Sequence, residues 1–84
     1  MTIHGYVKKR PFLFWDIRNL EALSEESILE HVLNYGDFDD VRKLFAILSL
    51  TRAAHIFRKQ IRKKRNNYRP EIKNYFTLYF NKYA

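Results

Sequence analysis

Apolar residues recur at helical spacing along most of this chain, and this periodicity restricts its fold more than any other feature. In residues 38–48 the apolar side chains fall on one face of a helix. These residues are Phe38, Val41, Leu44, Phe45 and Leu48. No segment alternates apolar and polar residues at the period of two that a half-buried strand requires. The sequence therefore predicts an all-α fold.

Helix-capping residues divide the periodic pattern into four helices. Ser24 is a favoured N-cap, and Gly36 is expected to end the first helix in the left-handed conformation. Asp37 and Thr51 are expected to cap the second and third helices, and Pro70 to open the fourth. The predicted helices span about residues 25–35, 38–48, 52–65 and 71–83.

The chain is long enough for one domain only, since it has 84 residues. Residues 1–11 contain three consecutive basic residues but no periodic apolar face, so we expect a flexible, extended basic arm that adds Lys8, Lys9 and Arg10 to any binding surface. Residues 12–84 are expected to form a compact four-helix domain. A short turn separates its second and third helices, which predicts a helix-turn-helix-like pair.

Charge is distributed unevenly along the chain. Sixteen Lys or Arg residues and nine Asp or Glu residues give a formal net charge of +7. Eight of the nine acidic residues lie within residues 16–40, whereas residues 41–70 contain ten basic residues and no acidic one. Such asymmetry is typical of proteins that bind nucleic acid or an acidic partner.

The third predicted helix places its basic residues opposite an apolar stripe. That stripe consists of Ala53, Ala54, Phe57 and Ile61. In a helix-turn-helix the N-terminal side chains of the second helix reach base edges, here Arg52, His55 and Lys59. Arg52 is the preferred base contact, because Arg can donate two hydrogen bonds to guanine. Phosphate contacts are predicted for Arg58, Arg62, Lys63, Lys64, Arg65 and Arg69. Ile56 falls among these residues and is expected to be exposed, where it would contact a thymine methyl group or a protein partner.

Several interpretations of this basic helix are open. The favoured one is contact with duplex DNA, for which about eight phosphate contacts predict a slope of about −7 for log K against log[salt]. Binding of an acidic protein partner and contact with RNA are the alternatives. A further alternative is a solvated surface that binds no partner. The helix dipole, which favours basic side chains near a helix C-terminus, would then account for Lys63, Lys64 and Arg65.

The sequence offers no pattern that supports catalysis. The three His residues lack metal-ligand spacing, no Ser lies in a nucleophile motif, and two Gly residues are too few for a phosphate-binding loop. Asp37, Asp39 and Asp40 are explained by helix capping and the helix dipole without a metal ion. We therefore expect no catalytic residue, metal ligand or cofactor. The lack of a signal peptide or a membrane-length apolar segment predicts a cytoplasmic protein.

The last predicted helix carries an almost wholly aromatic face. Its apolar residues recur at helical spacing and are Ile72, Tyr75, Phe76, Tyr79, Phe80 and Tyr83. This arrangement favours packing into the core over stacking of single-stranded bases on Tyr75 or Tyr79. Because helix-turn-helix proteins usually bind DNA as dimers, residues 71–83 are also the expected surface of a homodimer.

Three segments together resemble a known family: FLFWDI at residues 12–17, ILEHVLNYGDFDDVRKLF at residues 28–45 and YRPEIKNYFTLYF at residues 68–80. They resemble a small, poorly characterised prokaryotic domain family with an FWD signature, over roughly residues 11–80. Its members are often encoded beside nucleotidyltransferase-type toxins of the abortive-infection type. The resemblance implies an antitoxin or regulator role. We expect a DNA-binding protein that represses its own operon, or alternatively a module that binds an acidic toxin or other partner without any DNA role. The chain departs from the family pattern at FTLYF, where a Trp is expected.

Overall fold

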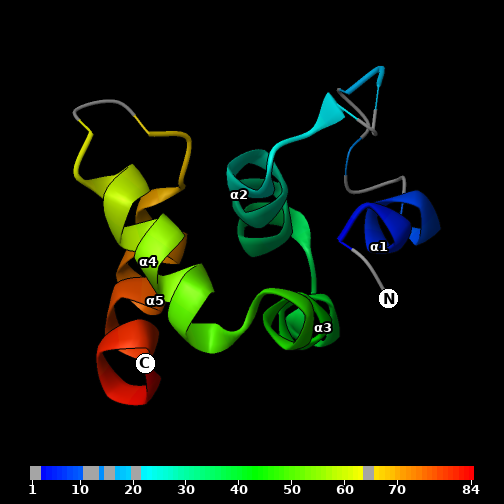
Figure 1. Ribbon diagram of the computed structural model, residues 1–84. Helices are drawn as coiled ribbons and strands as arrows, with labels where there is room; N and C mark the ends of the chain where they lie inside the picture. The colour runs from blue at the N-terminus through cyan, green and yellow to red at the C-terminus, as the bar shows by residue number, and fades with distance from the viewer. Residues whose placement is uncertain (1–2, 11–13, 15–16, 20–21, 64–65) are drawn as a thin grey trace.

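Five α-helices make up the fold of the residues that the computed structural model describes, which are 3–10, 14, 17–19, 22–63 and 66–84. They are α1 (Ile3–Lys9), α2 (Glu25–Tyr35), α3 (Phe38–Leu48), α4 (Leu50–Ile61) and α5 (Pro70–Tyr83) (Figure 1). No strand occurs within those ranges. The prediction of an all-α fold is therefore confirmed for this part of the chain, with α1 as a helix beyond the four that the sequence predicts.

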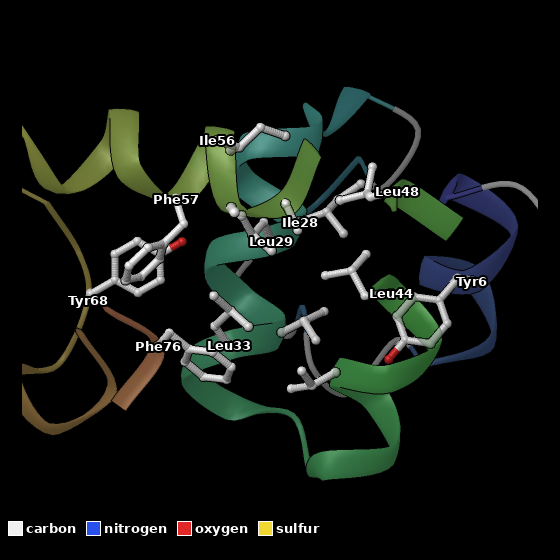
Figure 2. Close-up of a cluster of buried hydrophobic side chains, with 14 of the residues drawn as sticks. Tyr6, Ile28, Leu29, Leu33, Leu44, Leu48, Ile56, Phe57, Tyr68 and Phe76 are labelled. Carbon is white, nitrogen blue, oxygen red and sulfur yellow. The ribbon is translucent and has the colours of Figure 1, made fainter. Parts of the chain in front are cut away.

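Helices α2, α3 and α4 each pack against the other two, and the outer helices attach to this group. Helix α1 lies against α3, and α5 lies against α4 on the opposite side of the molecule (Figure 1). All five helices contribute to one hydrophobic core. Figure 2 shows its side chains converging between α2, α3 and α4, with Tyr6 reaching in from α1. In α4, Ala53 and Ala54 are buried, and such small side chains allow neighbouring helices to approach closely.

The N-terminal segment differs from the flexible arm that its sequence predicts. Residues Ile3–Lys9 form α1, in which Tyr6 and Val7 are buried. The His4 imidazole is hydrogen bonded to the carbonyl of Leu23 at 2.9 Å, which fixes α1 against the segment before α2. A helix of seven residues is marginal alone, so tertiary contacts hold it. Two core-facing residues are too few to produce a periodic pattern in the sequence. Residues 1, 2 and 11 of the predicted arm lie outside the described part of the chain.

Asp40 joins the first turn of α3 to α1. The side chain of Asp37 caps α3 by accepting from the Asp40 N–H at 2.8 Å, and Asp40 Oδ2 accepts from the Asp37 N–H at 3.1 Å. This is the reciprocal capping box that satisfies two free donors at a helix start. Asp40 also accepts from the Tyr6 hydroxyl at 2.7 Å and from the Arg10 guanidinium at 3.0 Å. Its carboxylate thereby anchors α1, a role that the sequence does not predict.

Gly36 ends α2, but for a different reason from the one expected. Its φ is −76°, so the left-handed conformation predicted for it is wrong. A Cβ at this position would lie 2.8 Å from the carbonyl oxygen of Val32 and 3.0 Å from Cβ of Asp40. Glycine is required here because the start of α3 passes close to the last turn of α2.

Ser49 alone connects α3 to α4. Its φ of 73° and ψ of 149° lie in a region that residues other than glycine rarely adopt. Its N–H closes α3 on the carbonyl of Phe45, and its hydroxyl accepts from the N–H of Arg52 at 3.2 Å. Ser49 is therefore the cap of both helices, and the N-cap predicted at Thr51 is wrong. Helix α4 begins at Leu50, two residues before the predicted start, and ends at Ile61, four residues before the predicted end.

Candidate nucleic-acid interface

One face of α4 and of the turn that follows it is exposed and basic. Its exposed residues are Thr51, Arg52, His55, Lys59, Arg62 and Lys63. We call the last five the basic face. The opposite side of α4 is buried against α2, α3 and α5, so the basic face is the side that the helix presents to solvent.

Arg52 lies in the first turn of α4 and forms an ion pair with Glu25 at the start of α2. Its Nε and its terminal nitrogen lie 2.8 Å and 2.7 Å from Oε2 of Glu25. The Arg52 side chain is nevertheless 59% exposed. Exposed pairs of this kind contribute about 1 kcal/mol or less, so Arg52 can exchange Glu25 for another anion at little cost.

Lys59, Arg62 and Lys63 continue the basic face toward the end of α4. Among the residues that the structure describes, none forms an ion pair with these three side chains. Lys63 nevertheless lines a depression that also contains Glu26 and Glu30, so its charge is partly offset by these two carboxylates. Together with Arg52 the three basic residues place four cations on one surface.

Two of the predicted phosphate ligands are engaged elsewhere. Arg58 is half-buried against α5 and donates to the carbonyl of Phe80 at 3.2 Å, an oxygen that also accepts from the N–H of Ala84. The guanidinium of Arg69 lies 5.0 Å from the centre of the Tyr35 ring, a cation–π contact. The structure thus gives Arg58 and Arg69 structural contacts away from the basic face. Lys64 and Arg65 lie outside the described residues.

Ile56 does not have the exposed position that its helical wheel predicts. Only 6% of its surface is exposed, so contact with a thymine methyl group is not available to it. The apolar side of α4 is wider than the four-residue stripe because α4 packs against α2 as well as against α3 and α5. The basic face therefore carries no exposed apolar residue among those described.

Amide side chains fasten the end of the basic face to α2. Asn34 is buried, and it donates to the carbonyl of Asn67 at 3.0 Å and accepts from the Arg69 N–H at 3.2 Å. Asn67 donates to Glu30 at 3.0 Å. Gln60 donates to the carbonyl of Glu26 at 3.0 Å. These contacts were not predicted from the sequence, although an Asn inside an otherwise apolar helix segment is the kind of signal that marks a buried polar contact.

Tyr68 completes this connection. Its hydroxyl donates to Oε1 of Gln60, and its ring packs edge-on against Phe57 with 5.1 Å between centres. Burial, and next the negative charge of Glu30, raise the pKa of Tyr68 above its ordinary value. Tyr68 therefore stays neutral as a donor and holds the chain after α4 against the core.

Acidic residues limit the basic face on the side of α2. A shallow depression of about 230 Å³ lies between α2 and the chain after α4. It is lined by Glu26, Ser27, Glu30, Gln60, Lys63, Asn66 and Asn67. This edge of the basic face is therefore less favourable for a polyanion than the surface around Lys59 and Arg62.

Within the described ranges, no group of three acidic or imidazole side chains is placed to hold a metal ion. None of the helices described has the length and apolar character needed to cross a membrane. Comparisons of the chain with protein-family models, with curated proteins and with solved structures found no match.

Proposed function

We propose that the protein is a non-enzymatic regulator that binds duplex DNA through the basic face of α4. The observation that carries this proposal is the composition of that surface. Every exposed residue from Thr51 to Lys63 in the described structure is a cation or a histidine, apart from Thr51 itself. The rest of α4 is packed against three helices, so its cations are displayed on a rigid support.

The order of α3 and α4 supports a helix-turn-helix-like use of the pair, although their connection at Ser49 is shorter than the usual turn of about three or four residues. The two helices follow each other through one residue, and α2 packs behind both. A helix is about 10–12 Å wide and fits the major groove, which is about 12 Å wide. In this arrangement Arg52 would reach base edges from the first turn of α4. Lys59, Arg62 and Lys63 would contact phosphates.

The salt dependence expected from the structure is weaker than that expected from the sequence. Arg58 and Arg69 are engaged in other contacts, and α1 lies on the opposite side of α3 from α4 (Figure 1). With four cations at phosphates, log K should fall with log[salt] with a slope of about −3.6. Lys64 and Arg65 would each add about −0.9 if they contact phosphates.

Fluorescence anisotropy with a labelled duplex tests this proposal. Lys59→Glu should weaken binding by more than about tenfold at about 50 mM salt and flatten the salt dependence. Lys9→Glu is the matched control, because it changes the charge equally at an exposed position on α1. Absence of duplex binding at about 50 mM salt would sink the proposal. Equal weakening by both variants, or a preference for structured RNA or an acidic protein over duplex DNA, would also contradict it.

The antitoxin role is proposed from the sequence resemblance alone. If it is correct, the protein should co-purify with the product of the neighbouring gene and reduce its toxicity on co-expression. Lys59→Glu should leave that complex intact if toxin and DNA are bound by separate surfaces.

A further inference from the structure

Helix α5 exposes large apolar side chains on the side away from the core. Its inner residues Phe76 and Phe80 are buried and pack against Phe45 and Phe57. On its outer side, Tyr75 is 49% exposed and Leu78 is 63% exposed. Single exposed apolar residues are ordinary, but here they are neighbours on one helix face.

These two residues belong to a stripe with a particular order of chemistry. Glu71, Tyr75, Leu78 and Lys82 are all exposed and are separated by four, three and four residues. That spacing is the one that lines up the contact residues of two paired helices. The stripe has an acidic residue at one end, a basic residue at the other and two apolar residues between them. Two copies of the stripe that run in opposite directions therefore place opposite charges together at both ends and apolar side chains together in the middle.

We propose that α5 is a homodimer contact, in which two copies of this chain pair their α5 helices antiparallel about a twofold axis between Tyr75 and Leu78. Glu71 then faces Lys82 of the partner subunit, and Tyr75 faces Leu78 of the partner subunit. Every contact occurs twice, as it must in a twofold interface. The two outer contacts are ion pairs, and the two inner ones are apolar.

The charges of the stripe also select the orientation and the occupant. A parallel pair would bring Glu71 against its own copy and Lys82 against its own copy, which is repulsive at both ends. A nucleic acid stacked on the tyrosines would meet the carboxylate of Glu71 at one end of the stripe. A second copy of the chain satisfies both ends, so it is the occupant that the charges favour.

Half-buried Tyr79 and exposed Tyr83 extend the apolar contact beside the stripe. Tyr79 lies between Tyr75 and Tyr83, with ring centres 6.2 Å and 4.8 Å away. A pair of 14-residue helices buries less than the roughly 800 Å² per partner of a standard interface. We therefore expect a weak, reversible dimer.

Sedimentation velocity of the full chain without DNA tests this inference. The wild type should pass from monomer to dimer between about 1 and about 500 µM. Leu78→Lys should remain monomeric over this range, whereas Ala46→Lys, with the same added charge at an exposed position of α3, should dimerise normally. Circular dichroism confirms that each variant is folded.

Charge reversal distinguishes the antiparallel pair from other dimers. Glu71→Lys and Lys82→Glu should each weaken the dimer about tenfold, because each reverses two ion pairs. The double variant Glu71→Lys/Lys82→Glu should restore it. A monomeric wild type at about 500 µM, or a dimer that is insensitive to these changes, would overturn the inference. Neither result bears on DNA binding, which the anisotropy titration measures separately.

Discussion

The Tyr6 hydroxyl donates a hydrogen bond of 2.7 Å to Oδ1 of Asp40, although 34 residues separate the two along the chain. The carboxylate is 3% exposed, and Arg10 approaches it with its Nε 2.9 Å from the same oxygen. Burial acts to raise the pKa of Asp40, but the hydrogen bonds from Tyr6, Arg10 and the Asp37 N–H outweigh burial and lower it. A charged carboxylate in the core is thus what attaches the N-terminal helix.

Tyr6→Phe should lower the free energy of unfolding by about 1.5 kcal/mol, because it removes a donor from a buried charged acceptor and leaves the ring in place. Tyr83→Phe is the matched control, since Tyr83 is 56% exposed, and it should change stability by less than about 0.5 kcal/mol. Urea unfolding followed by circular dichroism measures both. Equal effects would show that the Tyr6 hydroxyl contributes nothing.

Stability should fall when the pH drops below the ordinary pKa of an aspartic acid. Asp40 has a pKa below 3.8 in the folded state, so the folded protein holds this site ionised more strongly than the unfolded chain does. The resulting stabilisation is complete above about pH 5 and is lost as the pH falls through the folded pKa. The urea midpoint measured from pH 6 to pH 2 should therefore decline, and Asp40→Asn should decline less steeply from a lower starting value. Parallel curves for the two proteins would contradict this assignment.

Gly36→Ala should destabilise the protein by about 1–3 kcal/mol through crowding and not through backbone strain. Its φ of −76° suits any residue, but the added methyl group would lie 2.8 Å from the Val32 oxygen. Thermal unfolding provides the measurement. An unchanged or raised midpoint would mean that the last turn of α2 adjusts easily around this position.

Two substitutions at Ser49 should have different outcomes. Ser49→Gly removes the strain of a φ of 73° and gives up only a few tenths of a kcal/mol in capping. Ser49→Ala keeps the strain and loses the hydroxyl that accepts from Arg52. We therefore expect the Gly variant to be more stable than the Ala variant by about 2 kcal/mol in urea unfolding. The reverse order would rule out strain at this connection.

Glu25→Gln should strengthen binding to duplex DNA if the basic face is the interface. The change releases Arg52 from its ion pair and removes a negative charge beside the proposed contact. A gain of about three- to tenfold at about 50 mM salt is expected, fading as salt rises. Asp39→Asn, with the same change of charge on the exposed start of α3, serves as the control. No difference between the two variants would argue that Arg52 is not used.

Helical periodicity and capping chemistry were sufficient to predict the central helices. Ser24 and Asp37 act as N-caps as expected, and Pro70 opens α5. The N-cap predicted at Thr51 failed for a local reason, because Ser49 takes that role two residues earlier. Other failures arise because long-range contacts are absent from local sequence patterns. Helix α1 depends on Asp40, and the burial of Ile56 depends on how α2 crosses α4.

Only part of the candidate site was predicted, because contacts between different helices are not visible in the local sequence. Helical spacing correctly placed Arg52, His55, Lys59 and Arg62 on an exposed face. It could not show that Arg58 meets the end of α5 or that Arg69 lies over Tyr35, because these partners come from other helices. From residue type alone, both arginines were predicted to contact phosphates.

The attachment of α1 through Asp40 also sets an order on folding during synthesis. Tyr6 leaves the ribosome before its acceptor does, and translation at about 5–20 residues per second puts about 2–7 s between them. During that interval α3 is not yet available to α1, and the side chains of Tyr6 and Val7 remain exposed to water. Helix α1 therefore docks only after α3 has followed it out of the ribosome, and until then Tyr6 has no acceptor.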